Sequence, residues 1–255
     1  MDLRLKFNED VINYDKYRPT YVNELFMDII NYSKLDHTKN ALEIGIGTGQ
    51  ATMPILKTGC NLTAVELGGN LAAYSQSKFA SFDNFNVINI DFESYSSVAN
   101  RFNLVYSATA FHWLPEQIGF TKVFDLLKPK GVIALFWNHP HCENDAMHIE
   151  IQKAYDKYRP SSDKPKLEFD ENSCQKYIDL LNTYGFVNVT SKLYHQTRVF
   201  KVKEYISLLN TYSDHRAMDN DARIGLENEI SDAINKFGGR IDLHDTMDLY
   251  LGMKP

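Results

Sequence analysis

The sequence predicts an α/β protein built around a doubly wound, mostly parallel sheet. Over residues 41–137, short β-prone runs alternate five times with segments of helical periodicity, which is the pattern of a sheet covered by helices. The run 132–137 is apolar without interruption, as expected of a parallel strand that is buried on both faces. The first run leads directly into glycines at alternate positions, which predicts a ligand site at the carboxyl ends of the strands.

Each element can be bounded from the spacing of its apolar residues and from the turn residues beside it. The expected strands are residues 41–44, 62–65, 87–90, 103–106, 132–137, 187–200 and 240–253. The expected helices are residues 21–33, 48–56, 71–79, 120–127, 146–158, 173–183, 202–212 and 221–237. Lys128 to Gly131 should form the turn that precedes the fifth strand.

Composition narrows the class of protein. The 255 residues are 44% hydrophobic and 24% charged, which is ordinary for a globular chain and enough for one α/β domain with a cap. The net charge of −6 argues against nonspecific nucleic-acid binding, which needs a basic surface to displace counterions. Nothing in the sequence indicates an oligomeric state.

The cysteines and the N-terminus bear on location. Cys60, Cys142 and Cys174 are an odd number without C-x-x-C spacing, which favours free thiols in a reducing compartment. The first ten residues are too charged for the core of a signal peptide. No apolar stretch approaches the roughly 20 residues of a membrane span. We therefore expect a cytoplasmic protein that does not associate with membranes.

The glycine turn suggests which cofactor is bound. Gly45, Gly47 and Gly49 give G-x-G-x-G, whereas the dinucleotide fingerprint G-x-G-x-x-G would require glycine at Gln50. Glu43, at the mouth of the turn, would repel a pyrophosphate but attract an ammonium or sulfonium group. S-adenosylmethionine (SAM) carries both of these cations and no phosphate. An NAD-dependent oxidoreductase is the disfavoured alternative.

Glu43 and the glycine spacing together resemble the first motif of the class I SAM-dependent methyltransferases. The segments Y-D-x-x-R-P-x-Y (14–21), A-F-H-W (110–113) and L-L-K-P-x-G (126–131) resemble the group labelled type-11 or domain-25. The resemblance implies a Rossmann-like sheet of seven strands whose last strand is antiparallel. It also implies SAM as cofactor and transfer of a methyl group by an SN2 reaction.

Two acidic positions are expected to bind the adenosine part of SAM. Glu66 ends the second strand about 20 residues after the first loop glycine, where a carboxylate can accept from both ribose hydroxyls, and Leu67 follows it in the same site. The resemblance implies that Asp91, directly after the third strand, accepts from the adenine amino group. It also implies that Phe92 flanks the adenine ring.

The remaining candidates lie near the methionine end of the cofactor and the acceptor. The resemblance implies that Tyr14 and Arg18 approach the methionine end, with Arg18 paired to the SAM carboxylate. Ser107 and Ala108, at the end of the fourth strand, are small and leave room for a ligand. Three roles compete for His112: a general base near the acceptor, a polar wall of the SAM site, or a histidine satisfied in the core.

The C-terminal half departs from the alternating pattern. We expect residues 1–138 to form the SAM-binding core with its N-terminal helical segment, and 139–172 and 201–239 to form a cap or lid. Residues 173–200 and 240–255 should then complete the sheet. Potential metal ligands cluster at His139, His141, Cys142, Asp145 and His148, but their spacing matches no zinc framework, so we expect no metal site.

The sequence thus predicts a SAM-dependent methyltransferase that acts on a small organic molecule. Methyl transfer requires alignment of nucleophile, methyl carbon and departing sulfur more than a protein nucleophile, which suits a chain without an evident dyad or triad. Tyrosines in the expected lid suggest a small organic acceptor. A SAM-binding protein without catalytic activity stays open as an alternative, because binding and catalysis share these motifs.

Overall fold

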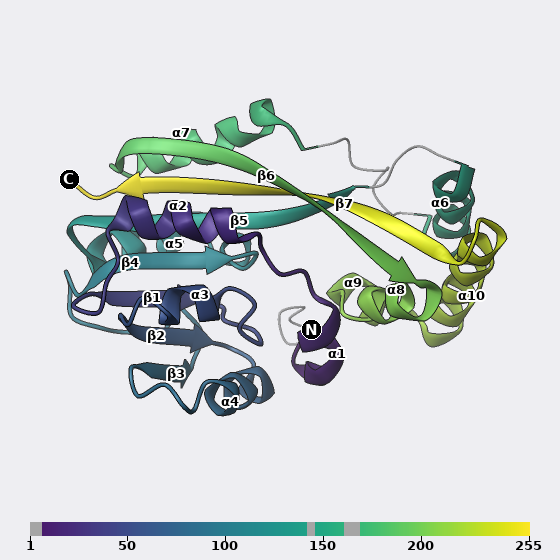
Figure 1. Ribbon diagram of the computed structural model, residues 1–255, viewed down its shortest axis with the longest axis horizontal. Coiled ribbons are helices and arrows are strands. Elements are labelled where there is room, and N and C mark those ends of the chain that lie inside the picture. Colours follow the sequence, from purple (N-terminus) through teal and green to yellow (C-terminus); the bar gives the residue numbers. More distant parts are fainter. Residues whose placement is uncertain (1–6, 142–145, 161–168) are drawn as a thin grey trace. The chain divides into compact units, whose positions relative to one another are not determined.

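A computed structural model describes residues 7–141, 146–160 and 169–255 of the chain (Figure 1). Within these residues, seven strands form one sheet in the order β3-β2-β1-β4-β5-β7-β6. The strands are β1 (Asn40–Ile44), β2 (Asn61–Glu66), β3 (Phe85–Asn89), β4 (Phe102–Ala108), β5 (Leu127–His141), β6 (Val187–Lys201) and β7 (Arg240–Met253). The pairs β1–β2, β2–β3, β1–β4 and β4–β5 are parallel, whereas β7 runs opposite to its neighbours (Figure 1). The predicted doubly wound sheet with an antiparallel last strand is confirmed.

The order of the sheet reverses between β1 and β4. β1 pairs with β2 on one side and with β4 on the other, so the chain crosses over after β3 to begin the second half of the sheet. In open α/β sheets, ligands bind beyond the carboxyl ends of the strands at this switch point. The glycine turn follows β1 directly and therefore lies at that point.

The long helices lie close to their expected positions. The helices are α1 (Val11–Tyr17), α2 (Asn23–Ser33), α3 (Thr52–Leu56), α4 (Gly69–Lys78), α5 (Glu116–Leu126), α6 (Ala146–Tyr158), α7 (Gln175–Thr183), α8 (Val202–Leu209), α9 (Ser213–Arg216) and α10 (Asn220–Lys236). Two short 3-10 helices, η2 (Phe111–Trp113) and η3 (Glu171–Cys174), are also present. The sequence predicted neither α1 nor α9, because each is too short to show a helical period.

Two of the expected boundaries that were wrong have a clear physical reason. The helix after the glycine turn begins at Thr52 rather than near Thr48, because Gly47 and Gly49 have φ of 57° and 84°, which an α-helix cannot contain. The expected turn at Lys128–Gly131 lies inside β5 as an irregularity: β4 pairs Phe102 with Leu127 and then Leu104 with Val132.

The chain divides into two compact units. The sheet unit comprises residues 19–138, 170–194 and 247–255, and the helical unit comprises the described residues among 1–18, 139–169 and 195–246. The long strands β5, β6 and β7 each contribute residues to both units. The sheet unit has its own apolar core, which includes Ile29, Leu42, Leu104 and Phe136. In the helical unit, apolar residues of α6, α8, α10 and β7 form a second core.

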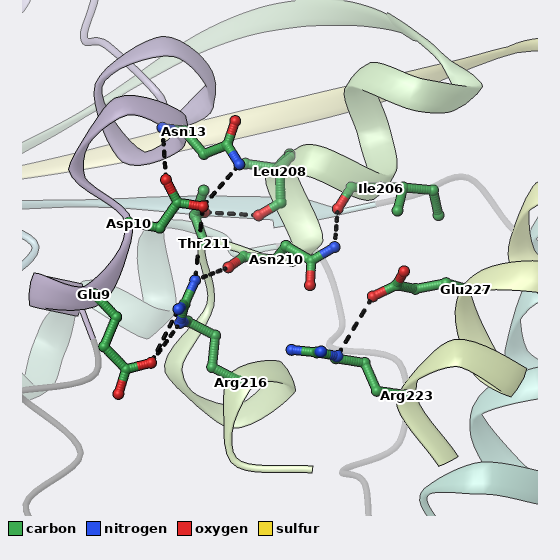
Figure 2. Close-up of polar contacts among 10 residues, drawn as sticks. All are labelled: Glu9, Asp10, Asn13, Ile206, Leu208, Asn210, Thr211, Arg216, Arg223 and Glu227. Atoms are coloured by element: carbon green, nitrogen blue, oxygen red, sulfur yellow. Dashed lines mark hydrogen bonds and ion pairs between the residues drawn. The ribbon is translucent and has the colours of Figure 1, made fainter. Parts of the chain in front are cut away.

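Residues 7–18 group with the helical unit, although the sequence analysis assigned them to the core of the sheet. Figure 2 shows one reason: Arg216 of α9 donates to the Glu9 carboxylate at 2.9 Å and lies 3.9 Å from that of Asp10. The same guanidinium donates to the backbone carbonyl of Asn210 at 3.2 Å. Asp10 also caps α1 by accepting from the Asn13 amide. These contacts hold α1 against the segment between α8 and α9.

Candidate functional site

The glycine turn after β1 is closed by its own hydrogen bonds. The N–H groups of Gly45 and Gly49 donate to the carbonyls of Val65 (2.8 Å) and Ile46 (2.9 Å). The N–H of Gly47 donates to the Glu66 carboxylate at 2.9 Å. A phosphate cradle would need these N–H groups for its ligand. The turn is therefore poorly suited to a pyrophosphate, which agrees with the absence of the dinucleotide spacing.

Glycine is required in the turn for two reasons. Gly45 has φ of 71°, and a Cβ on it would lie 2.6 Å from the Cβ of Ala110. Gly49 has φ of 84°, and a Cβ there would lie 2.3 Å from the Phe79 ring. The first contact also shows that the turns after β1 and β4 are packed directly together, as expected at the switch point.

Glu43 is buried at the end of β1. Its register partner on β4 is Tyr106, whose hydroxyl donates to Oε2 of Glu43 at 2.8 Å. The Thr52 hydroxyl, at the start of α3, donates to the same oxygen at 2.7 Å. Burial raises the pKa of Glu43 to about 7, against the lowering effect of both donors, and the charge of Glu66 raises it further. The carboxyl group is therefore poised to change charge near neutral pH.

Glu66 is buried at the end of β2 and binds the turn through backbone groups. Besides the Gly47 N–H, its carboxylate accepts from the N–H of Gly68 at 2.8 Å. Burial raises the pKa of Glu66, and these N–H donors oppose the rise. The Asn89 side chain of β3 donates to the carbonyls of Glu66 (2.8 Å) and Leu67 (3.0 Å). These bonds fix the backbone where β2 ends.

Glu43 and Glu66 form a pair of buried carboxyl groups beside the glycine turn. Neither has a lysine or arginine partner among the residues that the structure describes. Burying a carboxylate without a cation is costly, so this arrangement favours a ligand that brings positive charge. SAM carries an ammonium and a sulfonium group, and the two buried carboxyl groups of this site match that positive charge.

Asp91 and Phe92 follow β3 as predicted. Asp91 accepts from the N–H of Ser94 at 2.6 Å, which closes a short turn directly after the strand. Phe92 is buried and stacks on Tyr95, with ring centroids 6.4 Å apart. The Lys122 ammonium of α5 donates to the Phe92 carbonyl at 2.8 Å. The turn that carries Asp91 and Phe92 is therefore fixed by its own Asp91–Ser94 hydrogen bond and by the contact with Lys122 of α5.

The end of β4 lies against the end of β1. Ser107 is buried, and its hydroxyl donates to the carbonyl of Ile44 at 2.9 Å. Ala108 is half-buried, and the next residue, Thr109, has a positive φ of 53° and bonds the Tyr21 hydroxyl at 2.6 Å. The structure thus brings Ser107 and Ala108 to the strand end next to the glycine turn.

His112 is exposed on η2, just after β4, which does not fit a histidine satisfied in the core. Its Nδ1 accepts from the indole N–H of Trp137 at 2.9 Å. Sequence reasoning did not single out Trp137, nor Tyr106 and Thr52 as partners of Glu43. Trp137 lies near the carboxyl end of β5, which is the strand next to β4. This position in the sequence pattern could have marked Trp137 as a candidate for the site.

Tyr14 and Arg18 lie in the helical unit. The Arg18 guanidinium lies over the rings of Tyr14 and Tyr212, at 5.2 and 5.0 Å from their centroids. In the same unit, Arg198 of β6 donates through Nε and at 2.9 Å through Nη2 to the buried Asp245 of β7. Arg18 and Arg198 both lower the pKa of Tyr212, although its burial raises that pKa more.

Two expectations concern metals and membranes. Over residues 7–141, 146–160 and 169–255, no group of three His, Cys, Asp or Glu side chains could hold a metal ion. Cys142 and Asp145, which belong to the cluster noted in the sequence, lie outside the described residues. In that same part of the chain, no helix combines the length and the apolar character that crossing a membrane requires.

Comparison with known proteins gives the family context. Residues 41–131 match a family model described as a methyltransferase domain. An uncharacterized methyltransferase-like protein of Schizosaccharomyces pombe is 26% identical over 81% of this chain and 77% of its own length. The ribosomal RNA small subunit methyltransferase A of Hahella chejuensis is 34% identical, but over only 37% of this chain and 34% of its own length.

A solved structure shows the same fold. Phosphoethanolamine N-methyltransferase 2 of Haemonchus contortus, in complex with phosphomonomethylethanolamine and S-adenosylhomocysteine, superposes with a TM-score of 0.58 at 14% identity. The match covers 100% of this chain and 60% of that chain.

Proposed function

Since the chain belongs to the class I SAM-dependent methyltransferases of the domain-25 group and uses SAM as cofactor, we propose that it methylates a small organic molecule. The observation that carries the site assignment is the pair of buried carboxyl groups, Glu43 and Glu66, beside a glycine turn in which the N–H groups of all three glycines are already bonded. A cationic cofactor suits this arrangement, and a pyrophosphate does not.

Each site residue has a role in this proposal. Glu66 accepts from the ribose hydroxyls with the lone pairs that its two backbone donors leave free, and Leu67 lies beside it. Asp91 accepts from the adenine amino group, and Phe92 borders the ring. The glycine turn at Gly45, Gly47 and Gly49 allows the methionine part to approach the backbone. Glu43 supplies negative charge near it.

The methionine end and the acceptor involve further residues. Tyr14 and Arg18, which the sequence analysis assigned to the methionine end of SAM, belong to the helical unit. Ser107 and Ala108 leave space at the end of β4. The tyrosines in the segments that the sequence analysis assigned to a cap support the proposal of a small organic acceptor.

Bound SAM supplies an electrophilic methyl group and a thioether leaving group. The protein residues orient the two reactants and exclude water, and this alignment accounts for the rate without a protein nucleophile. His112 contacts the acceptor or the cofactor from the end of β4. A general base is needed only for an acceptor that carries a proton at the reacting atom.

The class of acceptor rests on composition and charge. The net charge of −6 disfavours a nucleic-acid substrate, although one partial relative acts on ribosomal RNA by name. The described cysteines, Cys60 and Cys174, are buried free thiols, which supports the proposal of a cytoplasmic location.

Calorimetric titration of the purified protein with SAM, S-adenosylhomocysteine and NAD tests the cofactor. We expect binding of the first two and none of NAD, and the reverse would overturn the site assignment. Incubation with methyl-labelled SAM and a pool of metabolites then tests the reaction. Label in a small-molecule fraction supports the proposal. Binding of SAM with no labelled product across a broad pool would favour a SAM-binding protein without catalytic activity.

A further inference from the structure

The hydrogen bond between Trp137 and His112 determines where the imidazole carries its proton. The indole Nε1–H can only donate, so Nδ1 of His112 must accept with its lone pair over the 2.9 Å that separates them. In the neutral ring the proton then resides on Nε2. A proton on Nδ1 would place two donors opposite each other and break this bond.

Trp137 is itself held firmly. Its backbone N–H donates at 2.8 Å to Oδ1 of Asp248, a buried carboxylate on β7, and the Tyr250 hydroxyl donates to Oδ2 at the same distance. The indole packs against the rings of Tyr177 and Tyr250, with centroids 4.4 and 6.0 Å away. Only 6% of Trp137 is exposed. The indole N–H therefore has a fixed direction, whereas the imidazole that it meets is on the surface.

We propose that Trp137 is a positioning residue that keeps His112 in its Nε2–H form, so that His112 donates a hydrogen bond to the bound ligand. This inference rests on the proposed function and narrows the roles left open for His112. A ring with its proton on Nε2 and its Nδ1 occupied has no free lone pair with which to act as a base. Any proton on the acceptor must therefore leave to another group or to solvent.

The tautomer can be measured without cofactor or acceptor. Long-range 1H–15N correlation spectra distinguish protonated from unprotonated ring nitrogens, and His112→Asn identifies the signals of His112 among the eight histidines. We expect an unprotonated Nδ1 and a protonated Nε2 in the native protein. In Trp137→Phe, which keeps the aromatic packing and removes the donor, both forms should be populated.

Trp113→Phe is the matched control, because the Trp113 ring also lies near His112, with centroids 5.1 Å apart, but is not the donor to Nδ1. This variant should leave the tautomer unchanged. A protonated Nδ1 in the native protein, or an unaltered spectrum of His112 in Trp137→Phe, would overturn the proposal.

A second readout separates positioning from a purely structural role. In Trp137→Phe we expect the affinity for S-adenosylhomocysteine to stay within about twofold, and methyl transfer into the labelled fraction to slow about three- to tenfold, the range of one lost hydrogen bond. An unchanged rate would contradict the positioning role. If no variant and no native protein labels any acceptor, the proposed function fails, while the spectra still decide the tautomer.

Discussion

The hydroxyl of Tyr106 and the carboxyl group of Glu43 are joined across adjacent parallel strands, 63 residues apart in the chain, by a hydrogen bond of 2.8 Å. Both groups are fully buried. Burial and the neighbouring Glu43 raise the pKa of Tyr106, so its hydroxyl stays protonated and remains a donor. The pair thus holds an ionisable carboxyl group in the wall of the proposed cofactor site.

Glu43 should make stability depend on pH. Its pKa is about 7 in the folded chain against 4.5 as the reference, so the folded state keeps a proton that the unfolded state has lost between these values. The free energy of unfolding should therefore fall as pH rises from about 4.5 to 7, by up to about 3 kcal/mol, and change little above. Urea denaturation at pH 5 and pH 8 measures the difference.

In Glu43→Gln the difference should be smaller, because the group no longer titrates. Glu66 contributes a dependence of the same sign that remains in this variant, since its pKa is also raised. Equal pH dependence in the native protein and in Glu43→Gln would show that Glu43 does not titrate in this range.

Glu66→Gln should weaken SAM binding. An amide has one oxygen and one NH2 group, so it cannot accept from both the Gly47 and Gly68 N–H groups as the carboxylate does. Loss of charge-assisted bonds to the turn and to the ribose should cost about 1–3 kcal/mol in binding, measured by calorimetry. Glu24→Gln, at an exposed position of α2, is the control and should bind as the native protein does. Unchanged affinity in Glu66→Gln would remove Glu66 from the ribose role.

Gly49→Ala should destabilise the sheet unit by about 2–5 kcal/mol, from the left-handed backbone together with the overlap of its Cβ with Phe79. Gly69→Ala provides the contrast within the same unit. Gly69 begins α4, and a Cβ there would lie 3.5 Å from its nearest neighbour, Asn89, which is ordinary contact. Thermal unfolding of both variants tests the difference, and equal melting temperatures would count against strain in the turn.

Arg198→Met should be far more disruptive than loss of an exposed ion pair. It would remove the guanidinium that donates to both carboxylate oxygens of Asp245, whose side chain is 0% exposed, and loss of such a buried ion-pair partner costs about 3–5 kcal/mol. Lys157→Met breaks the exposed pair with Glu229 in the same unit and should change stability little, because solvent screens this pair. Urea denaturation compares the two. Similar decreases in the free energy of unfolding for the two variants would show that burial of Asp245 does not determine how much its ion pair stabilises the fold.

The sequence predicted those parts of the fold that depend on local pattern, including where the candidate site residues lie relative to the strands. The glycine turn, Glu66 at the end of β2 and Asp91 after β3 were found because each is set by its distance from a neighbouring apolar run. The strand order could be expected only from the resemblance, since the period of a strand does not say which strand lies beside it. The limits of α3 were misjudged because propensity does not reveal positive φ.

Side-chain partners were out of reach for a different reason. Tyr106 meets Glu43 through the register of β1 and β4, and Trp137 of β5 meets His112 of η2, which lies 25 residues earlier in the chain. No periodicity within either segment encodes such pairs. The position of α1 against α9 likewise depends on the Arg216–Glu9 contact, between residues that are 207 positions apart.

The place of β7 in the sheet has a consequence for the order of events during synthesis. β6 leaves the ribosome before β7, but among the strands that the structure describes β7 is its only neighbour in the sheet. Until the last strand has emerged, β6 has no strand to pair with, and the edge of β5 that β7 will cover stays open. A nascent chain would therefore hold one unpaired strand and one open sheet edge at once, and this interval is where chaperone binding or misassociation should concentrate.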